Sequence, residues 1–69
     1  MRLRELRMQN GLSQRAVAAH LHISRRTYCA YESERRLPPV SVCIALARFY
    51  HTTVDYLVGL VDNPTPYQT

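Results

Sequence analysis

Arg25 and Arg26 are adjacent and directly follow Ser24, and another arginine, Arg15, lies two positions after Ser13. Serine is a preferred N-cap residue, so a helix is expected to begin at each of these serines. The planar guanidinium of arginine donates paired hydrogen bonds to a phosphate or to the O6 and N7 atoms of guanine. The residue types and their spacing therefore favour a polyanionic partner, bound by side chains at two helix starts.

The charge of the chain is divided unequally. Residues 1–36 contain eight arginines against three glutamates, a local charge of +5, whereas residues 37–69 contain one arginine against two aspartates, a charge of −1. All nine residues in the lysine and arginine count are arginines. A basic first half is typical of nucleic-acid-binding proteins, but an ordinary solvated surface would have the same charge, so both interpretations stay open on charge alone.

The remaining reactive side chains do not form a recognisable site. His20 and His22 are two positions apart, and His51, Cys29 and Cys43 are scattered, so no zinc-ligand spacing is present. A catalytic cysteine would need a base and an oriented pocket, for which a chain of 69 residues has little room. No glycine-rich phosphate loop or paired-carboxylate arrangement occurs. We expect neither an enzyme nor a bound metal or cofactor.

Length and composition indicate one small, packed and mostly helical domain. The sequence is 46% hydrophobic and contains only two glycines, which argues against many tight turns. No apolar segment approaches the roughly 20 residues that span a membrane, and no secretory signal is recognisable. We therefore expect a cytoplasmic protein with no membrane contact, whose two cysteines remain reduced.

Apolar periodicity and capping residues predict five short helices. They are expected at about residues 2–10, 13–21, 24–33, 40–50 and 54–58. Gly11 and Gly59 are placed to end the first and last of them in a left-handed conformation. Only His22 and Ile23 separate the second helix from Ser24, the cap of the third, so these two helices must meet at an angle across a tight turn.

Two charged residues return toward the apolar side of their helices. Arg7 lies four positions after Leu3 in the first helix, and Glu32 lies four positions after Tyr28 in the third. A charge beside the core needs a partner, so we expect Arg7 and Glu32 to form an ion pair.

The fourth helix is apolar on more than one side. Its usual inward stripe consists of Val40, Cys43, Ile44, Ala47 and Tyr50, which Val42, Leu46 and Phe49 extend most of the way around. We expect Val42 and Phe49, together with Tyr67, to form a dimer surface. The alternative is that the chain's own tail covers Val42 and Phe49.

Several segments, in order, resemble the phage repressor and Cro type of helix-turn-helix regulators, also called the xenobiotic-response-element (XRE) family. They are RLRELRMQNGLSQ, the small Ala18, LHIS, TYCAYE, RRLPP, LARFY and VDYLVGL, and they cover about residues 2–60. The resemblance implies an all-α, compact five-helix lambda-repressor-like domain over residues 1–61, in which the second and third helices form the helix-turn-helix. Residues 62–69, which contain Pro64 and Pro66, are expected to form an extended C-terminal tail.

The resemblance also implies a set of DNA-binding residues. Arg25, Arg26 and Ala30 match the base-reading positions, Thr27 matches one that touches base or phosphate, and Gln14 matches a glutamine that binds phosphate and braces the first reader. The complete expected set is Gln14, Arg15, Ser24, Arg25, Arg26, Thr27, Ala30, Arg35 and Arg36. Arginine at the two leading positions indicates at least one guanine in each half-site, with phosphate binding as the alternative role. For Arg35 and Arg36 the alternative is a solvated loop.

By family resemblance, the expected function is sequence-specific binding of double-stranded DNA by a transcriptional regulator, a repressor acting as a homodimer on an inverted repeat. The alternative is an antitoxin or coactivator-like module that holds another protein. Two departures bear on the turns: His22 and Glu34 stand where the family usually has glycine. Either those turns differ, or the protein tolerates a strained left-handed residue at each. Thr52 replaces a usually aliphatic residue, a small loss of core.

Overall fold

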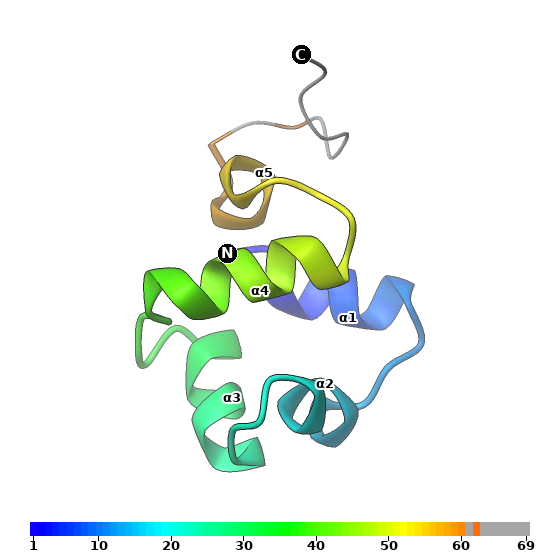
Figure 1. Ribbon diagram of the computed structural model, residues 1–69, viewed down its shortest axis with the longest axis vertical. Helices are drawn as coiled ribbons and strands as arrows, with labels where there is room; N and C mark the ends of the chain where they lie inside the picture. The colour runs from blue at the N-terminus through cyan, green and yellow to red at the C-terminus, as the bar shows by residue number, and fades with distance from the viewer. Residues whose placement is uncertain (61, 63–69) are drawn as a thin grey trace.

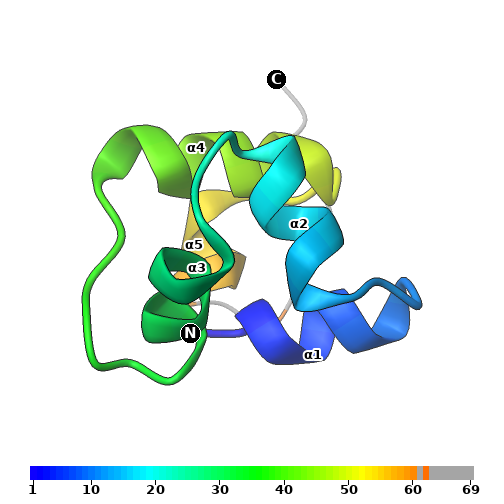
Figure 2. The same cartoon turned by 90° about the horizontal axis from the view of Figure 1, so that it is seen from below.

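The computed structural model describes residues 1–60 and 62, and these form an all-helical domain without a strand (Figure 1). The helices are α1 (Leu3–Gln9), α2 (Gln14–His20), α3 (Arg25–Glu32), α4 (Val40–Phe49) and α5 (Val54–Val58). Figure 2 shows α1 and α4 on opposite sides, with the angled α2–α3 pair between them. The predicted five-helix fold with a helix-turn-helix is confirmed.

Side-chain caps fix the starts of α2, α3 and α5. The hydroxyl oxygens of Ser13, Ser24 and Thr53 accept hydrogen bonds from backbone N–H groups three residues later, at 3.0, 3.1 and 3.1 Å. These bonds satisfy donors that have no partner inside the helix. The two serine caps predicted from the sequence are therefore present, Thr53 caps α5 in the same way, and the start of α3 is set by Ser24.

Each of the five described helices ends at a residue in the left-handed conformation. Gly11 and Gly59 have φ of 65° and 91°, as predicted, and His22 and Glu34 keep the same geometry with φ of 58° and 63°. The turns therefore do not differ from the glycine-containing form, and the strain of about 1 kcal/mol or more at each non-glycine residue is tolerated. His51, with φ of 54°, is a third such residue that the sequence analysis did not identify.

The same hydrogen bond closes all five helix ends. In each, the N–H of the residue after the left-handed one donates to the carbonyl five positions earlier, as in the Schellman motif. The bonds are Leu12 to Arg7, Ile23 to Ala18, Arg35 to Ala30, Thr52 to Ala47 and Leu60 to Asp55, at 2.8 to 3.1 Å. Carbonyls that would otherwise be unpaired at the helix ends are thereby satisfied.

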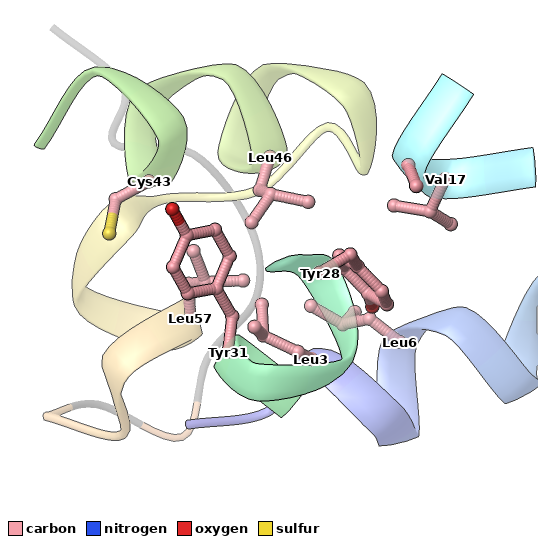
Figure 3. Close-up of a cluster of buried hydrophobic side chains, with 9 residues drawn as sticks. Leu3, Leu6, Val17, Tyr28, Tyr31, Cys43, Leu46 and Leu57 are labelled. Carbon is pink, nitrogen blue, oxygen red and sulfur yellow. The ribbon is translucent and has the colours of Figure 1, made fainter. Parts of the chain in front are cut away.

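The core surrounds α3. Tyr28 and Tyr31 are its inward residues, and Figure 3 shows them among side chains from the four other helices. The buried hydrophobic residues are Leu3, Leu6, Val17, Ala18, Tyr28, Tyr31, Cys43, Leu46, Ala47 and Leu57. Because Tyr28 and Tyr31 are buried in this common cluster, the opposite face of α3 is held at a fixed orientation.

The predicted apolar stripe of α4 is partly wrong. Val40 and Ile44 were expected to face inward but are 75% and 40% exposed, whereas Leu46 is fully buried. Periodicity shows that a helix has two adjacent apolar stripes but does not say which one meets its neighbours. Here the position of α3 and α5 selects the stripe that contains Leu46.

Of the three residues predicted to form a dimer surface, Val42 and Phe49 are in the described part of the chain and Tyr67 is not. Val42 and Phe49 are half-buried and pack against the chain's own core, and the Phe49 ring lies against the His20 ring with centroids 4.1 Å apart. Tyr67 lies outside the described residues, as does the predicted tail except for Asp62. The Asp62 carboxylate accepts a hydrogen bond from the Arg2 guanidinium at 2.9 Å.

Candidate nucleic-acid interface

Arg25 and Arg26 lie on the outer face of the first turn of α3. That face is exposed because Tyr28 and Tyr31 turn the opposite face into the core. Figure 2 shows α3 beside α2 in the view from below. In the described part of the chain neither guanidinium forms an ion pair, so both retain their hydrogen-bond donors for an external acceptor.

Ser24 and Thr27 make this first turn rigid. The Ser24 hydroxyl accepts from the Thr27 N–H at 3.1 Å and donates to the Thr27 side-chain oxygen at 2.9 Å. The Thr27 oxygen thus already has one partner, while its own hydroxyl proton remains free to donate. Both residues position the arginines between them.

Two open hollows flank Arg25. The α2–α3 hollow has a volume of about 530 Å³ and is lined by Arg7, Ser13, Gln14, Arg15 and Arg25. The α3–loop hollow has a volume of about 270 Å³ and is lined by Arg25, Arg26, Cys29 and Arg35. The structure therefore gathers five of the nine predicted DNA-binding residues around Arg25: Gln14, Arg15, Arg26, Arg35 and Arg25 itself.

Gln14 contacts a residue of α3 that the sequence analysis did not assign to the site. Its amide nitrogen donates to the sulfur of Cys29 at 3.8 Å. Gln14 and Arg25 line the same hollow, but a direct brace of Arg25 by Gln14 stays a prediction. Cys29 could have been found from helical spacing alone, since it follows Arg25 by four residues and Arg26 by three.

The loop arginines separate into two places. Arg35 lies in the α3–loop hollow, and its Nε donates to the Ser33 hydroxyl at 3.0 Å. Arg36 lines a different hollow of about 440 Å³ beside Leu37 and Val58. Arg35 is thus placed with the α3 arginines, whereas Arg36 is not.

Two further residues define the edges of the interface. Ala30 is half-buried on α3, and its carbonyl accepts the backbone N–H groups of Arg35 and Arg36 at 3.0 and 3.3 Å. Arg4, which the sequence analysis did not single out, is exposed on α1 and lines a hollow of about 260 Å³ with Gln14 and Cys29. Arg4 therefore extends the cationic surface from α3 toward α1.

The ion pair expected between Arg7 and Glu32 is present beneath this surface. Arg7 donates to the two carboxylate oxygens of Glu32 at 3.0 and 2.8 Å, and its third nitrogen donates to the Leu12 carbonyl at 2.9 Å. Burial would raise the pKa of Glu32, but the hydrogen bonds and the positive charge of Arg7 hold that pKa below its ordinary value. The carboxylate is therefore ionised and fixes α1 to α3.

No three histidine, cysteine or acidic side chains of residues 1–60 and 62 are grouped where they could share a metal ion. Over the same residues, none of the helices combines the length and the apolar character needed to cross a bilayer.

The comparisons with known proteins agree with this geometry. The model of a family described as helix-turn-helix matches residues 3–57, which include all five helices except the last residue of α5. The chain therefore belongs to the helix-turn-helix family, of the phage repressor and Cro type.

Individual relatives are bacterial and phage regulators. The chain is 40% identical over 65 residues to the uncharacterized HTH-type transcriptional regulator YobD of Bacillus subtilis (strain 168), covering 94% of this chain and 58% of YobD. It is 40% identical over 58 residues to the HTH-type transcriptional regulator AnsR of the same strain, covering 84% of this chain and 50% of AnsR. It is 33% identical over 58 residues to the cryptic phage CTXphi transcriptional repressor RstR of Vibrio cholerae, covering 84% of this chain and 52% of RstR.

The chain spans about half the length of the curated relatives it matches. No solved structure matches it.

Proposed function

We propose that the chain binds double-stranded DNA sequence-specifically and acts as a transcriptional repressor by occluding the polymerase. The observation that carries this proposal is the pair of exposed arginines, Arg25 and Arg26, on the outer face of a capped helix whose inner face is in the core. A helix held in this way enters the major groove as a rigid unit, with its first turn at the base edges.

Arg25 and Arg26 read guanine in this proposal. A guanidinium fork reaches O6 and N7 of guanine together, and each such pair discriminates against the wrong base by about 1 to 3 kcal/mol. Neither arginine is paired with a carboxylate of the described residues, so binding to DNA breaks no ion pair there. The half-site therefore contains at least one guanine.

The phosphate backbone on either side of Arg25 and Arg26 is bound by Gln14, Arg15 and Arg35. Gln14 and Arg15 line the α2–α3 hollow, and Arg35 lines the α3–loop hollow. Phosphate contacts fix the register of a protein on DNA without selecting sequence, and each releases counterions. Arg36 contributes less, because it lines a different hollow.

Two copies bind one inverted repeat. Half-sites one helical turn apart let two small interfaces act together, which raises the effective affinity. Val42, Phe49 and Tyr67 are the proposed dimer contacts. The protein works in the cytoplasm, on its DNA, and we assign no catalytic reaction to it.

The test is selection from a random duplex pool with the wild type and an Arg25→Ala, Arg26→Ala double variant. We expect the wild type to enrich an inverted repeat that contains guanine and the double variant to enrich none. Arg36→Ala is the matched control, since it removes one positive charge outside the two hollows and should keep the same repeat. Failure of the wild type to enrich any sequence would refute the proposal.

A protein-interaction module, such as an antitoxin, is the second candidate. Exposed apolar side chains favour it: Leu37, Val40, Ile44 and Leu60, at 82, 75, 40 and 76% exposure. Salt separates the two functions, because DNA affinity should fall linearly with salt on a log–log plot and apolar association should not.

A further inference from the structure

The α3–loop hollow contains one apolar group among three arginines. Cys29 is a half-buried side chain of α3, and it lines this hollow with Arg25, Arg26 and Arg35. Successive turns of a helix place residues three and four apart beside each other, so Cys29 lies directly above the two base-reading arginines. A base adjacent to the guanine that Arg25 or Arg26 binds would therefore contact Cys29.

Building on the proposed function, we infer that Cys29 is a specificity-determining residue that contacts the C5 methyl group of a thymine adjacent to the guanine. A reduced cysteine behaves as a small hydrophobic side chain with only weak hydrogen-bonding power. The thymine methyl is the apolar feature that distinguishes an A·T pair in the major groove. Cytosine lacks it and is selected against at this position.

The surrounding groups support a methyl contact. The three arginines of the hollow are directed to guanine or phosphate acceptors and offer a methyl group nothing but their aliphatic stems. Gln14 donates to the Cys29 sulfur at 3.8 Å, so the thiol is held in place from α2. Ala30, the other small residue on this side of α3, does not line the hollow.

The same hydrogen bond supplies the rival role, in which Cys29 only positions Gln14. Contact with a thymine methyl group and positioning of Gln14 predict opposite effects for two substitutions of Cys29. Serine keeps an acceptor for Gln14 but places a polar group against the methyl, whereas alanine keeps an apolar surface and removes the acceptor. Cys29→Ser and Cys29→Ala therefore separate methyl recognition from the positioning of Gln14.

The experiment measures the affinity of the selected operator after each thymine is replaced in turn by deoxyuridine, which removes only the methyl group. We expect one position in each half-site at which the wild type binds about fourfold more weakly, as for the loss of one buried methyl-sized group. Cys29→Ser should bind both duplexes equally, and Cys29→Ala should keep about half of the difference. The ratio is taken within each variant, so a change in its folded fraction cancels.

Cys43→Ser is the matched control, because it makes the same change at the buried cysteine of α4, outside the interface, and it should keep the wild-type ratio. An unchanged ratio in Cys29→Ser, or an equal loss of the methyl effect in Cys43→Ser, would refute the role of Cys29 while leaving the DNA-binding function intact. A selected operator without any methyl-sensitive position would refute it as well. A wild type that selects no operator would refute the proposed function, and this inference with it.

Discussion

Arg7 and Glu32 join α1 to α3 through two parallel hydrogen bonds, and the Glu32 side chain is only 6% exposed. A buried pair of this kind contributes little net stability by comparison with apolar residues, but removal of one partner leaves the other charge without compensation. The orientation of α3 therefore depends on Arg7, a residue of α1.

Arg7→Ala should lower the free energy of unfolding by about 3 to 5 kcal/mol, because it leaves the Glu32 carboxylate unpaired beside the core. Urea unfolding followed by circular dichroism measures this change. Arg4→Ala, on the same helix but exposed, is the control and should stay within about 0.5 kcal/mol of the wild type. Equal stability of the two variants would remove the ion pair from the account of the fold.

Stability should fall in acid through Glu32. The pKa of Glu32 is held below its ordinary value in the folded state, so its contribution is complete at neutral pH and above the unfolded pKa. That contribution is lost as the pH falls from about 5 through the folded pKa. Glu32→Gln should therefore show a lower stability at pH 7 and a shallower acid transition in pH-dependent thermal unfolding. The pKa of Glu34 is also lowered, but Glu34 is present in both the wild type and Glu32→Gln. The difference between their acid transitions therefore reports on Glu32 alone.

His51→Gly should stabilise the protein. His51 has φ of 54°, a conformation that costs a residue with a Cβ about 1 kcal/mol or more, and glycine adopts it without that strain. The greater entropy of glycine in the unfolded chain offsets part of the gain, so we expect a net increase of about 0.5 kcal/mol. Thermal unfolding measures it, with His51→Ala as the control. Both variants lack the imidazole, so a lower melting temperature for His51→Gly than for His51→Ala would mean that relief of the backbone strain does not outweigh the entropy of glycine.

Arg15→Ala should weaken DNA binding equally for all sequences. A phosphate contact contributes affinity without base preference, so the variant should select the same operator and reduce the slope of log affinity against log salt by about 1. Arg48→Ala, an exposed arginine on α4, should leave the slope unchanged. A change in the preferred sequence, with an unaltered slope, would assign Arg15 to base reading instead.

Local signals in the sequence predicted the five helices and several of their ends, but not the left-handed His51 that follows α4. Ser13, Ser24 and Thr53 cap their own helices, and Gly11 and Gly59 end theirs, because these interactions involve residues within a few positions. The resemblance to the phage repressor type added the assignment of α2 and α3 as the helix-turn-helix, which the family match confirms.

What the sequence did not predict depends on how helices are placed against each other. The exposure of Val40 and Ile44 follows from which side of α4 meets the core, and no pattern within α4 decides that. The separation of Arg35 from Arg36 follows from the path of the loop after α3. Cys29 is different: helical spacing alone places it next to Arg25 and Arg26, but its side chain carries no charge that would mark a contact with nucleic acid.

The inward tyrosines of α3 divide that helix into two parts with separate tasks. Tyr28 and Tyr31 anchor it among the other helices, while Arg25, Arg26, Cys29 and Ala30 contribute little to the core. A designer could therefore exchange these four outward side chains as a set and keep the anchor unchanged. Under the proposed function, such an exchange would change the preferred operator without a new fold being built.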